Sequence, residues 1–259
     1  MKHKKVFDMV LFSTFSAIIL ILTLVPNIGY IRVGVASITI VHIPVLIGIM
    51  FLGLGYSLSL GLVFGLSSLI AAFMYASSPA DLAFQNPIIS VLPRIVFALV
   101  AFYIIRLLFL IRKKSKYGNL INFIIVTVVS TTFILFASEG IVTVTNWYRS
   151  IVYPVGILLL VVLLTGYIFF IRKSKHKNLA YVPAAFIVST LIHTVLVLGT
   201  LGLMKPAAFG DNADIFGIIL SVLGTNGVIE AAAGVLIGTP IVVALKNLIE
   251  KDELDESLI

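Results

Sequence analysis

The sequence lacks cysteine altogether and has few charged residues, and each shortage excludes classes of protein. Without cysteine there is no disulfide framework, no thiol nucleophile and no thiolate metal site. With 11% charged and 60% hydrophobic residues, a chain of 259 residues cannot build a water-facing surface around one or two soluble domains. The composition therefore excludes a soluble globule and predicts an integral membrane protein.

Catalytic motifs are missing too. The sequence contains no GxxxxGK[ST] phosphate loop, no HExxH and no GxSxG, and no cytoplasmic loop is long enough to house an ATPase. We therefore expect no enzyme activity, no cofactor and no metal, and any ATP hydrolysis must come from another subunit. The formal charge of +7 does not indicate a nucleic-acid partner, because the basic residues cluster at the ends of apolar runs.

Long apolar runs predict an all-α membrane protein with about eight helical spans in a single transmembrane domain, 1–259. The expected spans are 7–26, 36–53, 56–75, 89–111, 120–142, 151–171, 180–203 and 217–248. The first run has no small-residue cleavage site and is read as a retained helix. The last run is too long for one crossing, and counting about 20 residues back from its end places its outer boundary near Val228.

The distribution of lysine and arginine sets the expected orientation. With both termini in the cytoplasm, 14 of the 18 basic residues fall on the inner side and 4 on the outer side. The opposite orientation would invert this split, against the positive-inside rule. We therefore expect both termini, including the acidic tail at 251–259, to be cytoplasmic.

A few polar side chains interrupt the predicted spans. An unpaired ionisable group in hydrocarbon costs at least a few kcal/mol, so each needs a partner, water or a function. All fall in the outer half of the bundle, which predicts a small-molecule site open to the outside and roofed by loops 27–35, 76–87 and 204–214. The candidate residues are His42, Asn86, Arg94, His193, Asn226 and Glu230.

Structural explanations compete with this site. Asn226 and Glu230 are four residues apart and could hydrogen-bond within the bundle, whereas Arg94 could reach lipid headgroups. Each histidine alone is more often a satisfied core residue. A zinc site at His42, His193 and Glu230 is a weaker hypothesis, because the three come from separate helices without a diagnostic spacing.

Small residues recur at helical spacing. Ser13 and Ala17 form one such pair, and Gly61 and Gly65 form a GxxxG motif. These faces allow another helix to approach closely. Packing within the bundle is the default interpretation, and docking of a partner helix is the alternative.

Four stretches, taken in order, resemble one membrane-protein family. They are Ser37-Ile-Thr-Ile-Val-His42-Ile-Pro44-Val-Leu-Ile-Gly48, Asn86-Pro87-Ile-Ile-Ser90-Val-Leu-Pro93-Arg94, His193-Thr-Val-Leu-Val-Leu198-Gly199 and Thr225-Asn226-Gly227-Val-Ile-Glu230-Ala231. Together they are similar to the substrate-binding S component of energy-coupling factor (ECF) vitamin transporters, and most like its pantothenate-specific members. The likeness covers 1–112 and 178–250.

The resemblance implies a six-helix bundle in a bacterial cell membrane that captures a vitamin, with pantothenate expected. It implies docking on a membrane coupling subunit with two ATPases, through a face that Ser13 and Ala17 occupy here, and reorientation to release the ligand inward. Residues 113–177 would be an inserted pair of transmembrane helices. Family members often carry asparagine where His193 stands. The alternatives are an S component for another vitamin and, from another class, a proton-coupled secondary transporter that uses Glu230 and the histidines. A membrane enzyme is disfavoured.

Overall fold

The computed structural model describes residues 2–33, 36–173, 179–209 and 215–256. Within them, seven helices are long and apolar enough to cross a membrane. The protein is therefore a multi-pass, all-α membrane protein, as the composition predicts. Six crossing helices are α1 (Lys2–Leu24), α3 (Leu54–Tyr75), α6 (Leu92–Lys114), α7 (Gly118–Thr145), α8 (Arg149–Lys173) and α9 (Tyr181–Met204), and the seventh crosses at Val228–Ile249.

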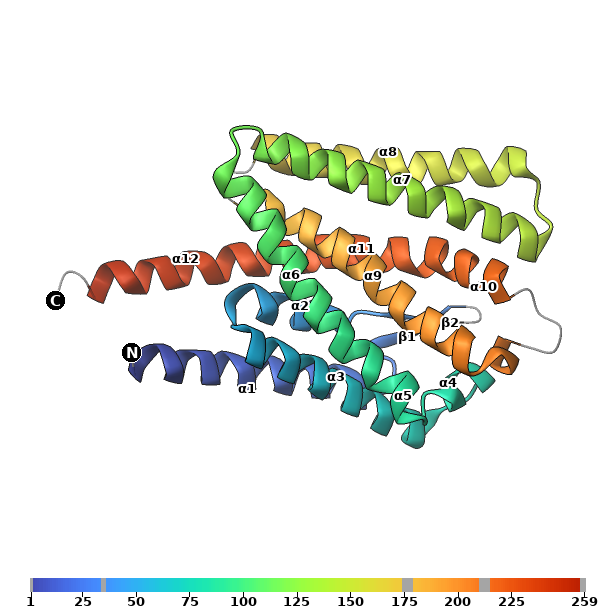
Figure 1. The fold of residues 1–259 in the computed structure, drawn as a ribbon, viewed down its shortest axis with the longest axis horizontal. Coiled ribbons are helices and arrows are strands. Elements are labelled where there is room, and N and C mark those ends of the chain that lie inside the picture. Colours follow the sequence, from blue (N-terminus) through green and yellow to red (C-terminus); the bar gives the residue numbers. More distant parts are fainter. Residues whose placement is uncertain (1, 34–35, 174–178, 210–214, 257–259) are drawn as a thin grey trace.

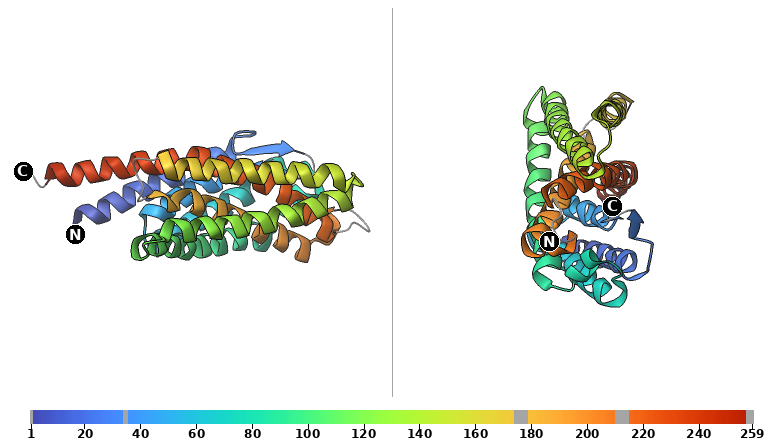
Figure 2. Two further views of the ribbon diagram at one scale, coloured as in Figure 1. Left: turned by 90° about the horizontal axis from the view of Figure 1, so that it is seen from above. Right: turned by 90° about the vertical axis from the view of Figure 1, so that its right-hand side faces the viewer.

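The helices run lengthwise through one bundle. The N-terminal end of α1 and the C-terminal end of the last helix lie at the same end of it (Figure 1). The opposite end carries the short elements α4 (Pro79–Ala83) and α5 (Pro87–Ser90) and the 3-10 helix η2 (Pro206–Phe209). In the end view of Figure 2, α8 lies at the periphery of the bundle.

The segment at 36–53 differs from the expected helical span. Strands β1 (Tyr30–Val33) and β2 (Ala36–Thr39) pair antiparallel, with Tyr30 opposite Thr39, before α2 (His42–Phe51) begins. The run Ser-Ile-Thr-Ile-Val is rich in β-branched residues, which favour extended backbone. At 1.5 Å per residue α2 is about 15 Å long, half the hydrocarbon thickness. The expectation of one continuous span here is wrong, and a hairpin followed by a buried half-length helix takes its place.

The last helix is continuous but irregular. It runs through α10 (Ile215–Val222), a π-helical segment η3 (Leu223–Gly227), α11 (Val228–Ala233), a second π-helical segment η4 (Gly234–Gly238) and α12 (Thr239–Glu256). A Cβ at Gly238 would lie only 2.1 Å from the Phe186 ring of α9, so this helix packs very closely against α9. The crossing part begins at Val228, where the length of the run places it. Residues before it continue in line with the helix and pack on α7 (Figure 1).

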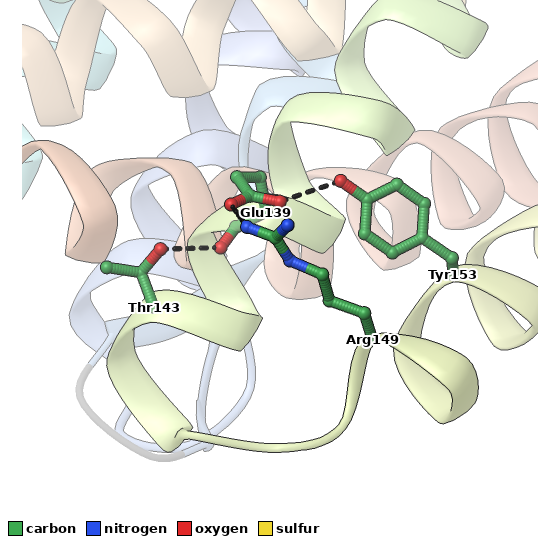
Figure 3. Close-up of polar contacts among 4 residues, drawn as sticks. All are labelled: Glu139, Thr143, Arg149 and Tyr153. Atoms are coloured by element: carbon green, nitrogen blue, oxygen red, sulfur yellow. Dashed lines mark hydrogen bonds and ion pairs between the residues drawn. The ribbon is translucent and has the colours of Figure 1, made fainter.

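Helices α7 and α8 form an antiparallel hairpin that a polar cluster joins near its tip (Figure 3). Arg149 donates to Glu139 Oε1 at 2.5 Å, and the Tyr153 hydroxyl donates to Glu139 Oε2 at 2.7 Å. Asn146 ends α7 in the left-handed conformation, with φ of 57°, which asparagine tolerates. Of the two helices, α7 makes most of the contacts to the rest of the bundle, chiefly to α9 and α10, while Tyr167 of α8 donates a hydrogen bond to the Ala180 carbonyl oxygen.

The GxxxG motif packs inside the bundle. A Cβ at Gly61 would lie 2.6 Å from the Ala98 Cβ, and one at Gly65 would lie 2.8 Å from the Val91 Cα. Both glycines therefore let α3 approach the start of α6 closely. This close approach sets the position of Arg94, whose carbonyl oxygen would lie 2.8 Å from the Gly61 Cβ.

Candidate functional site

A cavity of about 150 Å³ lies toward the end of the bundle opposite the termini. A single water needs roughly 10–15 Å³, so the cavity has room for a small molecule. A second cavity, beside Ser130 and Leu163, measures about 10 Å³ and is too small for one. The polar lining of the large cavity comprises Tyr30, Thr39, Ser68, Tyr75, Asp81, Arg94, His193, Thr194, Asn226 and Glu230.

Arg94 lies in the first turn of α6, directly after Pro93, and its side chain is 4% exposed. One guanidinium nitrogen donates to the Ile89 carbonyl oxygen at 2.9 Å. The guanidinium carbon lies 4.9 Å from the centre of the Phe84 ring and 5.7 Å from that of Phe64, both within cation–π range. Among the described residues no carboxylate lies within 4.0 Å of this cation. Arg94 therefore brings a buried positive charge to the cavity without an ion pair.

Glu230 lies on α11, between the two π-helical segments, and is 3% exposed. Its Oε1 accepts a hydrogen bond from the Thr39 backbone N–H at 2.7 Å, and its Oε2 accepts one from the Thr194 hydroxyl at 3.1 Å. The carboxylate thus joins the last helix to β2 and to α9. Each oxygen has a second acceptor site, so Glu230 can still accept a donor from a molecule in the cavity.

The two predicted histidines lie together. The rings of His42 and His193 stack with centroids 5.5 Å apart and planes inclined by 18°. Phe97 packs edge-on against His193 at 4.8 Å, and Phe64 lies 5.5 Å from it. His193 lines the cavity, whereas His42 lies behind it and next to Glu230.

The two predicted asparagines separate. Asn226 is buried in η3, lines the cavity and precedes Glu230 by one turn. Asn86 is the N-cap of α5, where its side-chain oxygen accepts from the Ile88 N–H at 2.9 Å, and it is not part of the lining. The structure therefore brings five of the six candidates to the cavity or its wall and leaves Asn86 apart.

Each of the three expected roof loops contributes to the lining. Tyr30 comes from loop 27–35, Phe84 from 76–87 and Phe209 from 204–214, although residues 210–214 lie outside the described part of the chain. Burial raises the pKa of the Tyr30 hydroxyl, and the nearby Arg94 charge partly offsets this rise. Tyr30 is therefore neutral and can donate a hydrogen bond.

Several lining residues are missed by sequence reasoning, among them Tyr30, Thr39, Phe84 and Thr194. Thr39, the last residue of β2, and Thr194, next to His193, both stand inside the family-like stretches, so those stretches contained the signal. Threonine and tyrosine are tolerated throughout membrane helices and loops, so residue type alone does not distinguish them. Only the fold brings the Thr39 N–H to Glu230.

Apolar crossing helices around a partly polar cavity define a multi-pass membrane protein with room for a small molecule near one end. The family model described as ECF transporter, substrate-specific component, matches residues 7–156. This match covers more than half of the sequence, and the chain belongs to that family. The matched range includes α7 and the start of α8, so it does not mark 113–177 as an insertion. The inserted hairpin therefore stays a prediction.

One relative carries a functional name. The "Pantothenate transporter PanT" of Leuconostoc mesenteroides subsp. mesenteroides is 34% identical over 104 residues, which is 39% of this chain and 51% of the relative. The chain thus spans about half the length of the relative that it matches.

Proposed function

We propose that this protein is the substrate-capture subunit of an ATP-driven vitamin uptake system and that its ligand is pantothenate. Membership of the family and the name of the relative support this proposal. The observation that carries it is Arg94, a buried cation that lines the cavity without an ion pair among the described residues. A carboxylate on the ligand would supply the missing charge.

The cavity suits the functional groups of pantothenate: a carboxylate, an amide and two hydroxyls. Arg94 would bind the carboxylate, because a guanidinium matches it bidentately. Glu230 would accept from a hydroxyl or from the amide N–H, and Asn226 and His193 would hydrogen-bond the remaining polar groups. The apolar part of the wall, with Leu198, Leu201 and Phe84, would cover the ligand's gem-dimethyl and methylene carbons.

Transport would need partners. Lysine and arginine are concentrated toward the end that carries both termini, which supports a cytoplasmic position for that end and an outward-facing cavity. In this proposal the protein docks on a membrane coupling subunit with two ATPases through Ser13 and Ala17. Both residues are exposed on α1, whose surface is largely uncovered by the rest of the chain. Reorientation on these partners would release the ligand inward.

The experiment is a binding titration of pantothenate to detergent-purified protein, with Arg94→Ala beside the wild type. We expect the substitution to weaken binding at least about 10-fold, since a charge-assisted hydrogen bond contributes about 1.5–3 kcal/mol. Arg149→Ala is the matched control, because Arg149 is an arginine of the α7–α8 tip with 69% side-chain exposure. Equal pantothenate affinity in Arg94→Ala and wild type would remove Arg94 from the site.

Two further readouts separate the alternatives. Mass spectrometry of small molecules that copurify with the protein identifies the vitamin, and another carboxylate vitamin would keep the class and change the ligand. A proton-coupled secondary transporter would accumulate solute in vesicles under a pH gradient without ATP. Purified protein of the proposed kind would not accumulate it.

A further inference from the structure

The wall between the cavity and α2 contains three potential metal ligands. His42 begins α2, His193 lies midway along α9, and Glu230 lies on α11. One ligand atom of each lies within 4.8 Å of the others, and each side chain is at least nine-tenths buried. Three separate elements therefore bring two imidazoles and a carboxylate to one point.

The imidazole nitrogens of this group lack hydrogen bonds. Neither nitrogen of His193 and neither nitrogen of His42 has a partner with hydrogen-bond geometry among the described residues. Phe64 and Phe97 close the other sides of His193. Because a buried polar atom without a partner costs about 1–3 kcal/mol, these two rings indicate a bound species, and a metal ion would take one nitrogen from each of them.

The backbone of Thr39 lies beside two of the three potential ligands. A ligating histidine usually directs its other ring nitrogen to a backbone carbonyl or a carboxylate, which fixes the ring. The backbone of Thr39 lies next to the His42 ring, but the two do not form a hydrogen bond. The Thr39 N–H also donates to Glu230, so the same residue binds one potential ligand and lies beside another.

We propose that His42, His193 and Glu230 bind one divalent transition-metal ion, of the class to which Zn²⁺ belongs. Two neutral imidazoles select such ions over Mg²⁺ and Ca²⁺, which prefer oxygen ligands. Bonds of about 2.1 Å at tetrahedral angles place ligand atoms about 3.4 Å apart, so separations of up to 4.8 Å shorten by at most about 1.4 Å around the ion. The three residues show no diagnostic spacing in the sequence because they come from three separate elements, and the site was therefore a weak hypothesis from sequence.

The fourth coordination position faces the cavity, because His193 and Glu230 both line it. The ion with Glu230 carries a net charge of +1 next to the Arg94 cation. An anionic group in the cavity therefore meets two positive centres. The proposed metal site does not depend on the identity of the vitamin. If the ion is bound, its open coordination position can also bind a carboxylate.

The test uses the full-length protein, purified without a histidine tag, stripped with a chelator and reloaded with Co²⁺ or Zn²⁺. We expect one ion per chain by elemental analysis and intense visible Co²⁺ absorption typical of four ligands. His42→Phe should bind the ion at least about tenfold more weakly. The matched control is the double variant His3→Gln/His176→Gln, which removes the other two histidines and should bind metal as the wild type does.

His42 does not line the cavity, so its variant separates the two proposals. If His42→Phe does not fold, Glu230→Gln replaces it, with the melting temperature measured with and without Zn²⁺. Metal-dependent stabilisation in the wild type alone supports the site. Equal Co²⁺ spectra in wild type and variant, or less than 0.1 ion per chain after reloading, roughly the background of such measurements, overturn it. Pantothenate binding in the presence of chelator is the readout that tests the vitamin proposal separately.

Discussion

Arg94 and Glu230 line the same cavity but do not form an ion pair. Arg94 is bound to the Ile89 carbonyl and packed on two phenylalanine rings, and Glu230 is bound to Thr39 and Thr194. Each charge is therefore held in place by a different set of elements: α5 for Arg94, and β2 with α9 for Glu230. Two fixed, opposite charges with a cavity between them favour a ligand that has an anionic end and hydrogen-bond donors.

Removing the Glu230 charge should weaken both binding and the fold. In Glu230→Gln the amide oxygen can accept from the Thr39 N–H, but the amide nitrogen can only donate, so the Thr194 hydroxyl must change from donor to acceptor and neither contact remains charge-assisted. We expect the loss of about 1–3 kcal/mol of stability, measured by thermal unfolding in detergent, and at least about 5-fold weaker pantothenate binding. The control is Glu139→Gln, in the half-exposed cluster of the α7–α8 hairpin. Equal effects of the two substitutions would contradict the role given to Glu230.

A methyl group at Gly61 should disturb the cavity indirectly, by displacing α6, which carries Arg94. Gly61→Ala places a Cβ 2.6 Å from the Ala98 Cβ and 2.8 Å from the Arg94 carbonyl oxygen, so α6 must shift. Overpacking of this kind costs about 1–3 kcal/mol, more than the ~1 kcal/mol that alanine gains over glycine in a helix. We expect a lower melting temperature and weaker pantothenate binding.

The same substitution at Gly199 is the matched control. A Cβ at Gly199 meets no atom within 4 Å, so Gly199→Ala should be neutral or stabilising in the same thermal assay. If Gly61→Ala unfolds at or above the wild-type temperature, α3 and α6 are not in the close contact described.

Much of this architecture could be predicted from sequence because hydrocarbon imposes a simple rule. The length of an apolar run sets a crossing helix, as for α3, α6 and α9, and a polar residue inside such a run needs a reason. Arg94, His193, Asn226 and Glu230 were found by that rule, and the structure brings them to one cavity.

The parts that could not be predicted depend on contacts distant in sequence. The Thr39 N–H at the end of β2 reaches Glu230 across 191 residues, and only the path of the β1–β2 hairpin brings the two together. The hydropathy of 36–53 fits a single crossing helix as well as a hairpin followed by a short helix. The length of the apolar run therefore predicted a crossing helix, which is wrong. Asn86 shows the converse error, because an asparagine that caps a helix is indistinguishable by residue type from one that faces a ligand.

The Phe84 ring should contribute to carboxylate binding through Arg94. It lies 4.9 Å from the guanidinium carbon and also lines the cavity. Phe84→Ala removes a cation–π contact of about 0.5–2 kcal/mol and loosens the guanidinium, so we expect roughly 2- to 30-fold weaker pantothenate binding. Calorimetric titration measures it, with Phe73→Ala as the control because Phe73 is 64% exposed on α3. A larger loss in the Phe73 variant would contradict this account.

Enlarging the small-residue face of α1 should separate capture from transport. Ser13 and Ala17 are exposed and one turn apart, so a large side chain there leaves the cavity untouched and prevents a partner helix from approaching. We expect Ser13→Trp/Ala17→Trp to bind pantothenate with wild-type affinity and to lose at least about 10-fold in ATP-dependent uptake, when reconstituted with its coupling subunit and ATPases. Leu158→Trp, at a 62% exposed position on α8, controls for an added aromatic ring at the lipid surface and should transport normally. Uptake at the wild-type rate by the double variant would place the docking face elsewhere. An equal loss of uptake in Leu158→Trp would show that any added tryptophan at the lipid surface has this effect.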